Sequence, residues 1–119
     1  MRSSRGEIKI EDILKGAGVN FVEEYSFNDL VSSSGRPLRF DFAVMDDSGD
    51  LDFLIEYQGC QHYEAKSKFG GAKGLYQQQY NDKQKRLYCA KHGYKLVIIP
   101  YWEEGLIDYD YIMKAAYDW

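Results

Sequence analysis

The stretch "LRFDFAVMDDSGDLDFLIEYQG", residues 38–59, decides the fold. Two alternating apolar segments flank the turn-forming sequence "DDSGD" (46–50), which is the pattern of a β-hairpin. We expect strands over 38–46 and 51–59. Because neighbouring side chains in a strand point to opposite faces, alternate residues should share a face. These are Leu38, Phe40, Phe42 and Val44 in the first strand, and Leu51, Phe53, Ile55 and Tyr57 in the second.

Two carboxylates interrupt these apolar strands. Asp41 lies seven residues before Ser48, and Glu56 lies seven residues after Gly49. Across a tight hairpin they should stand nearly opposite each other, with Cβ atoms roughly 5 Å apart. Carboxylates that close repel unless a cation lies between them, which predicts a Mg²⁺ site suited to phosphodiester hydrolysis. The alternative is a pair of structural acids, each bound to Arg39 or a lysine.

The remaining sequence predicts a mixed α/β domain. The order is α-β-β-β-α-β-α, and a helical crossover leads to a fourth strand that is parallel to the third. We therefore expect one domain, 1–119, with a mixed four-stranded sheet flanked by helices. The further segments are a helix within 3–18, a strand over 21–27, a turn-rich connection over 28–37, a Lys/Gly loop over 66–74, a helix over 75–93, an apolar strand over 94–101 and a closing helix over 108–119.

Composition narrows the class of protein. The chain has 119 residues and enough apolar side chains for one core. It contains no apolar run of membrane-spanning length and no signal-like N-terminus, so we expect no membrane partner and a cytoplasmic location. Cys60 and Cys89 are accordingly expected to be reduced thiols.

The charge is polarised along the chain. Glu64 to Lys95 contains eight basic and two acidic residues, whereas the rest contains seven basic and seventeen acidic residues. Such a basic segment favours a polyanion as partner, although most charge runs are simply solvated. The candidate nucleic-acid-binding residues are Lys66, Lys68, Lys73, Lys83 and Arg86, with Asp82 among them.

Five short motifs occur in an order that resembles the PD-(D/E)XK nuclease superfamily. They are "SSRGE" (3–7), "RFDF" (39–42), "IEYQGCQHY" (55–63), "YNDKQKR" (80–86) and "GYKLVIIPY" (93–101). The chain is most similar to a compact branch that resembles very-short-patch-repair endonucleases and phage or homing-type nucleases. The resemblance spans roughly residues 4–102 and implies a restriction-endonuclease-like fold.

The resemblance also implies roles for individual residues. Asp41 and Glu56 would hold Mg²⁺, or Mn²⁺ as a substitute, assisted by the Tyr57 carbonyl. Gln58 occupies the usual lysine position but carries no charge, so either its amide suffices to orient the water or charge arrives from elsewhere. Lys85 is the candidate for a relocated lysine. On the predicted helix it shares one face with Gln78, Asp82 and Cys89, opposite Tyr76, Tyr80 and Leu87. The other matching positions are Glu7, which could reach the metal through water; His62, which could contact phosphate or move a proton; and Asp82, which pairs with Lys85 in the family pattern.

Each of these roles has a structural alternative. Asp82 and Lys85 could form an ordinary surface ion pair on one helix, and Glu7 could serve only a capping box with Ser4. His62 could be an interior or rim histidine without a catalytic role. Two cysteines and two histidines also raise a zinc site as a further alternative; these are Cys60, His62, Cys89 and His92.

Together these features predict a Mg²⁺-dependent DNA endonuclease. The resemblance implies a phage or mobile-element origin, and hence the host cytoplasm as its location. A homodimer is plausible because the domain is barely large enough to surround a duplex. The alternative class is a catalytically weak or inactive nuclease fold that binds nucleic acid or a partner protein, which Gln58 and the acidic pI of 5.1 would favour.

Overall fold

The computed structural model describes residues 4–67 and 70–117. The expected order of helices and strands is confirmed, and these described ranges add the 3₁₀ helices η1 and η3. The elements are α1 (Arg5–Gly16), β1 (Asn20–Val31), β2 (Pro37–Met45), β3 (Leu51–Gln58), η1 (Cys60–His62), α2 (Gly71–His92), β4 (Lys95–Pro100), η3 (Tyr101–Leu106) and α3 (Tyr109–Tyr117).

The four strands form one mixed sheet in the order β1-β2-β3-β4. β1, β2 and β3 are antiparallel neighbours, and β4 is parallel to β3 because α2 carries the chain back across the sheet. The β2–β3 hairpin has the register expected from the turn, with Phe42 opposite Ile55 and Val44 opposite Phe53. Asp46 closes that turn by donating its N–H to the Asp50 carbonyl at 2.8 Å.

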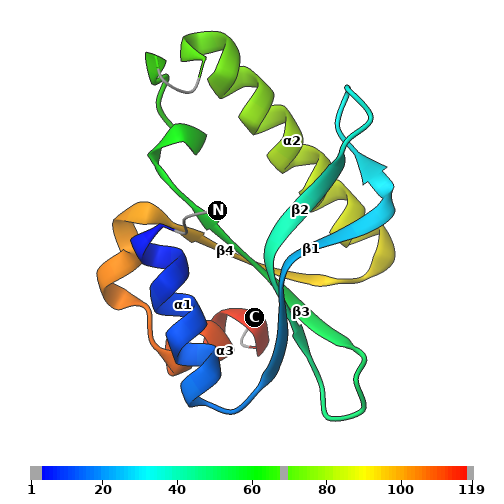
Figure 1. The fold of residues 1–119 in the computed structure, drawn as a ribbon, viewed down its shortest axis with the longest axis vertical. Coiled ribbons are helices and arrows are strands. Elements are labelled where there is room, and N and C mark those ends of the chain that lie inside the picture. The colour runs from blue at the N-terminus through cyan, green and yellow to red at the C-terminus, as the bar shows by residue number, and fades with distance from the viewer. Residues whose placement is uncertain (1–3, 68–69, 118–119) are drawn as a thin grey trace.

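Helices cover both faces of the sheet (Figure 1). α1 and α3 lie on one face, where their apolar side chains meet Phe53, Ile55 and Val97 of the sheet. We call this the α1–α3 cluster; its helical members are Ile10, Leu14, Ile112 and Ala116. α2 lies on the other face, over the α2 cluster, which consists of Leu30, Leu38, Phe40, Ala43, Leu54 and Cys89.

The predicted alternation along β2 is wrong at one point. Leu38 and Phe40 pack in the α2 cluster, whereas Phe42 joins the α1–α3 cluster. The slip occurs at Asp41, and the register places Glu24 of β1 across from it in a left-handed conformation with φ of 52°. A non-glycine residue in this region marks a local departure from regular strand geometry. Asp41 therefore sits at a bend, between two segments that bury opposite faces.

Two predicted boundaries also differ from the structure. β1 continues through 28–31, which the sequence analysis assigned to a turn-rich connection, because Leu30 is buried in the α2 cluster. The turn itself is confined to Ser32–Arg36, where the Ser32 N–H donates to the Arg36 carbonyl at 2.8 Å. α2 begins at Gly71 and not at residue 75. Gly70 and Gly71 lead into it with positive φ values of 90° and 62°, and the Gly74 N–H donates to the Gly70 carbonyl at 3.1 Å.

A second slip in alternation occurs after the hairpin turn. Leu51 packs against the α2 cluster, although the expected alternation put it on the same face as Phe53. The β2–β3 register shifts between Val44 and Met45, which pairs with Leu51. One extra residue in a ladder turns the following side chains to the other face.

α2 has an unusual distribution of polar and apolar side chains. Its inward face buries Asp82, Lys85 and Cys89, whereas Tyr76 and Leu87 are exposed on its outward face. The expected division of the helix into these two faces is confirmed. Across the described ranges 4–67 and 70–117, no helix combines the length and apolar character that a membrane crossing requires.

Candidate functional site

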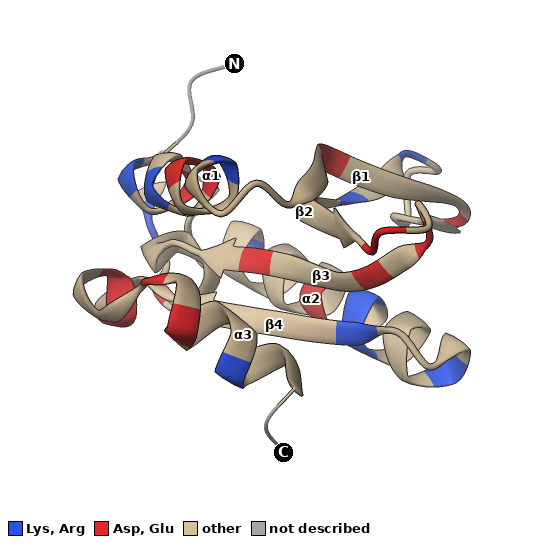
Figure 2. Cartoon of the chain, turned by 90° about the horizontal axis from the view of Figure 1, so that it is seen from below, with Lys and Arg blue, Asp and Glu red and all other residues tan. Residues whose placement is uncertain are grey.

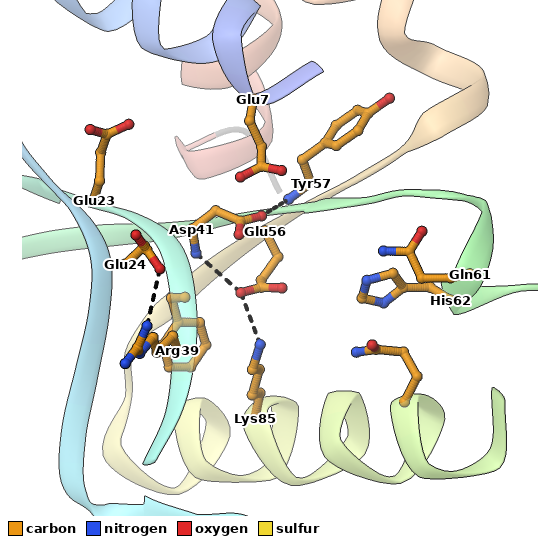
Figure 3. Close-up of a pocket in the computed structure, with 12 residues that line it drawn as sticks. Glu7, Glu23, Glu24, Arg39, Asp41, Glu56, Tyr57, Gln61, His62 and Lys85 are labelled. Atoms are coloured by element: carbon orange, nitrogen blue, oxygen red, sulfur yellow. Dashed lines mark hydrogen bonds and ion pairs between the residues drawn. The ribbon is translucent and has the colours of Figure 1, made fainter. Parts of the chain in front are cut away.

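A pocket of about 360 Å³ opens at the bend in β2. Its walls come from α1, β1, β2, β3, η1 and α2 (Figure 3). Five of the six predicted catalytic residues line it, namely Glu7, Asp41, Glu56, His62 and Lys85. The other lining residues are Glu23, Glu24, Arg39, Phe40, Tyr57, Gln61 and Gln78.

Asp41 and Glu56 are linked by hydrogen bonds that each carboxylate accepts from a backbone N–H of the opposite strand. The Asp41 N–H donates to Glu56 Oε1 at 3.2 Å, and Asp41 Oδ2 accepts the Tyr57 N–H at 2.7 Å. These bonds use one oxygen of each carboxylate. The two acids lie where the β2–β3 ladder ends, one step beyond the paired residues Phe42 and Ile55. The hairpin therefore brings both acids together at its open end, as the sequence predicted.

Burial disfavours the charge on both acids. It raises the pKa of Asp41 to about 6, a rise opposed by the Tyr57 N–H and increased by the Glu7 carboxylate. Burial raises the pKa of Glu56 to about 8, opposed by the Lys85 ammonium and increased by the Asp41 carboxylate. Two adjacent carboxyl groups with raised pKa values are the electrostatic situation that a bound cation relieves.

Lys85 reaches Glu56 from the opposite side of the pocket (Figure 3). Its Nζ donates to Glu56 Oε1 at 3.1 Å, and both side chains are buried. The predicted alternative of a surface ion pair between Asp82 and Lys85 is wrong. Both point inward from α2, and each binds a residue of another segment. A helical (i, i+3) spacing permits such a pair, but here the tertiary partners are nearer.

Asp82 binds His62, which η1 places directly after the β3 segment. His62 Nδ1 and Asp82 Oδ2 lie 2.8 Å apart, and both residues are buried. Gln78 Nε2 donates to Asp82 Oδ1 at 3.3 Å, so the carboxylate is held at both oxygens. A carboxylate on Nδ1 fixes the orientation of an imidazole ring. Asp82 is therefore buried against two residues that line the pocket and is not part of an exposed basic surface.

Glu7 forms the capping box of α1 and also lines the pocket. The capping box is confirmed, because Ser4 Oγ accepts the Glu7 N–H at 3.2 Å and the Glu7 carboxylate accepts from Ser4. The same side chain lines the pocket and raises the pKa of Asp41. Gly6 makes this approach possible, since a Cβ there would lie 2.2–2.6 Å from the Tyr57 ring.

Gln58 is absent from the residues that line the pocket. It is buried, and its Oε1 accepts a hydrogen bond from the Tyr63 hydroxyl at 2.6 Å. The Gln58 amide is thus directed to Tyr63 and not into the pocket, where it was expected to orient a water molecule.

The predicted zinc alternative does not form. Cys89 is buried in the α2 cluster, His62 binds Asp82, and the His92 ring packs on Tyr88 and Tyr94. Over residues 4–67 and 70–117, no three His, Cys, Asp or Glu side chains are grouped so as to hold a metal ion.

The pair of Asp41 and Glu56 still fits a cation of the Mg²⁺ type. Mg²⁺ is commonly held by one or two carboxylates, with water and substrate phosphate as further ligands. Hard carboxylate oxygens in a partly buried pocket meet that requirement, and the raised pKa values favour a cation there. The donor set does not suit zinc, which prefers a closed set of nitrogen and sulfur ligands.

The predicted basic residues lie outside the pocket. Lys73, Lys83 and Arg86 are exposed on α2, and Lys66 is half-exposed with an ion pair to Glu64 at 3.2 Å. Lys68 lies outside the described residues. Figure 2 shows acidic positions on β3 and basic positions along α2, so the charge polarity of the sequence persists in the fold.

Sequence reasoning did not assign several residues of the pocket. Gln61 lies beside His62 in η1, and Glu23, Glu24 and Arg39 come from the bend of β1 and β2. Arg39 Nη1 donates to Glu24 Oε1 at 3.1 Å at the rim. A signal was available for Gln78, which lies one helical turn before Asp82 on the same face. No comparable pattern marked Glu23, Glu24 and Arg39, whose position follows from the bend, or Gln61, whose position follows from η1.

One known protein shows clear similarity to this chain. It is "Uncharacterized protein 094L" of Frog virus 3 (isolate Goorha), which is 37% identical over 101 residues. The alignment covers 82% of this chain and 63% of the viral protein, so the chain spans less than two thirds of that relative. No family model and no solved structure matches the chain.

Proposed function

We propose that this chain is a divalent-metal-dependent endodeoxyribonuclease with a restriction-endonuclease-like fold of the PD-(D/E)XK type. The observation that carries the proposal is the convergence of Asp41, Glu56 and Lys85 at the open end of the hairpin. Two acids and a lysine are the charged groups that the family pattern requires, although the lysine here comes from a helix. A viral or other mobile-element origin agrees with the similarity to a frog-virus protein.

Asp41 and Glu56 would hold Mg²⁺, with the Tyr57 carbonyl as a further ligand. A bound Mg²⁺ ion would polarise the scissile phosphate and lower the pKa of a water molecule. Lys85 keeps Glu56 oriented through its 3.1 Å hydrogen bond and places positive charge where phosphate charge increases. His62, oriented by Asp82, would donate a proton to the leaving oxygen or contact the phosphate.

The exposed basic residues would then hold the nucleic-acid backbone outside the pocket. Lys73, Lys83 and Arg86 project from α2, and Lys66 lies in the segment that leads into it. Phosphate contacts of this kind position a strand without reading its sequence. The same proposal predicts that the protein acts in the host cytoplasm. It also predicts a homodimer.

A plasmid-nicking assay with MgCl₂ or MnCl₂ tests the enzymatic function. Asp41→Asn and Glu56→Gln should each lower cleavage by more than about a hundredfold, because even the outer partners of metal ligands are worth 10–100-fold. Asp47→Asn is the matched control, since Asp47 is an exposed acid of the hairpin turn. Wild-type cleavage in both pocket variants would contradict the proposed site.

A second candidate is a nuclease fold that binds nucleic acid or a partner protein without cutting. The position of Gln58 outside the pocket favours it, as does the small number of clustered metal ligands. Calorimetric titration with Mn²⁺ separates the two functions. An enzyme should bind the ion and lose that binding in Asp41→Asn. An inactive fold should bind no metal and show no nicking.

A further inference from the structure

Three aromatic rings form an exposed cluster next to the pocket. We call Tyr63, Tyr101 and Trp102 the ring cluster. The Tyr63 and Trp102 centroids are 4.8 Å apart, the Tyr101 and Trp102 centroids are 5.4 Å apart, and the Tyr63 and Tyr101 centroids are 6.0 Å apart. Trp102 is 61% exposed and Tyr63 is 37% exposed. Large rings gathered at the surface are suited to stacking on another planar group.

The ring cluster is continuous with the pocket. Tyr63 directly follows His62, whose ring lies 6.5 Å from its own and which lines the pocket. Tyr63 is also held by Gln58, whose strand neighbours Glu56 and Tyr57 line the same pocket. A group bound on the rings would therefore be close to a group bound beside Asp41.

Side chains of both charges lie beside the rings. Lys66 binds Glu64, and Glu64 Oε2 accepts the Tyr101 hydroxyl at 2.8 Å. Burial raises the pKa of Tyr63, an effect increased by the carboxylates of Asp82 and Glu103 and opposed by the Arg86 guanidinium. The neighbouring acids Glu103 and Glu104 are engaged by the hydroxyls of Tyr111 and Tyr57.

From this arrangement we infer that the ring cluster stacks an unpaired base of a single-stranded nucleic acid, with the adjoining phosphate directed into the pocket. This inference rests on the proposed function and names its substrate class. Rings flanked by positive charge are the usual surface for single strands, because every base offers a face for stacking. A base within a regular duplex offers no such face, since both of its faces are already stacked.

The inference also accounts for Gln58. A lysine at this position cannot accept a hydrogen bond, whereas the glutamine carbonyl accepts the Tyr63 hydroxyl at 2.6 Å. Gln58 is therefore a positioning residue for the ring cluster. With Lys85 supplying charge from α2, the strand position is free to serve the aromatic surface.

Tryptophan emission provides the direct test. The chain has two tryptophans, so in a Trp119→Phe background Trp102 is the single emitter. An oligothymidylate of about 12 nucleotides, within the usual length of a single-strand site, is titrated in EDTA so that no cleavage is needed. Emission should fall on binding, and a duplex of the same length should bind about tenfold more weakly.

Substitutions then locate the contact by anisotropy of a labelled oligothymidylate. Trp102→Ala should weaken binding about tenfold, as expected for the loss of one stacked base. Leu106→Ala is the matched control, since Leu106 lies on the same 3₁₀ helix, is 65% exposed and carries no ring. Gln58→Leu and Tyr63→Phe should weaken binding equally and without additivity, while Gln58→Glu, which retains an acceptor, should not.

The outcomes separate the inference from the proposed function. Unchanged Trp102 emission, equal binding of duplex, or equal effects of Trp102→Ala and Leu106→Ala would each overturn the ring-cluster inference. If the single strand binds through Trp102 but no DNA is cut with any metal, the inference stands and the enzymatic proposal fails.

Discussion

Lys85 Nζ lies 3.1 Å from Glu56 Oε1, although 29 residues separate them in the chain. In the nuclease pattern that the sequence resembles, the lysine follows the second acid on the same strand. Here that strand position is Gln58, which faces Tyr63. The positive charge comes instead from α2, on the opposite side of the pocket. Stability and cleavage should both depend on this contact.

Replacement of Lys85 tests that contact. Lys85→Met leaves Glu56 buried without its cation. Above pH 8, where Glu56 is ionised, we expect a loss of about 3–5 kcal/mol in the free energy of unfolding together with loss of cleavage. Lys83→Met on the exposed side of the same helix is the control and should be near neutral. Urea denaturation measures both. A double variant, Lys85→Met with Glu56→Gln, should recover most of the stability, and no recovery would argue against a coupled pair.

The raised pKa values of the two acids predict a stability that falls with rising pH. The ordinary values are 3.8 for Asp41 and 4.5 for Glu56, and in the folded protein they rise to about 6 and about 8. Between these limits the folded state binds more protons than the unfolded chain, so the free energy of unfolding decreases from about pH 4 to pH 8. Thermal melting across this range measures the effect.

Divalent metal should reverse that loss of stability. Because Mg²⁺ binds the ionised acids, MgCl₂ should raise the melting temperature at pH 8 much more than at pH 5. The Asp41→Asn, Glu56→Gln double variant serves as the reference and should respond to neither pH nor metal in this way. An equal metal response in the double variant would place the ion elsewhere.

Gly6 should be intolerant of any side chain. A Cβ at this position would meet the Tyr57 ring at 2.2–2.6 Å, so Gly6→Ala must displace the start of α1. We expect a loss of about 1–3 kcal/mol, as for other overpacked sites. Gly16→Ala, in the same helix, meets nothing within 4 Å and should leave the stability unchanged or slightly raised. Equal urea midpoints for the two variants would contradict the proposed close approach.

The pairing of His62 with Asp82 predicts that Asp82 supports cleavage. Asp82→Asn removes the carboxylate but can keep a hydrogen bond to the ring, so the loss should be in rate rather than in folding. We expect at least about a tenfold fall in cleavage, within the range for a positioned proton-transfer group. Initial rates with a fixed plasmid measure the fall, and urea denaturation checks that the fold is kept. An unaltered rate would contradict a role for the pair in cleavage.

The sequence was sufficient for the hairpin and for its two acids. Equal counts from Ser48 and Gly49 give the register that pairs Phe42 with Ile55, and Asp41 and Glu56 follow from it. This succeeds because a tight turn fixes the register of the strands that it joins. The division of α2 into two faces was also readable, because the helical period alone determines which side chains share a face.

The hydrogen-bond partners of those side chains could not be predicted from the sequence. Whether Asp82 meets Lys85 or His62 depends on how deeply α2 sits against the sheet, which no local pattern specifies. The change of face at Asp41 was also hidden, because it depends on Glu24, in a different strand. The position of Gln58 outside the pocket depends on Tyr63, whose ring is placed by packing on Trp102.

The buried charges on the inward face of α2 affect how the helix aligns with the sheet. A helix that packs only through apolar side chains can slide along a sheet by one turn, about 5.4 Å, at modest cost. Such a slide would leave Lys85 and Asp82 buried without Glu56 and His62, and an unpaired buried charge is far more costly than a lost apolar contact. The charged groups of the pocket therefore specify a single alignment of the helix.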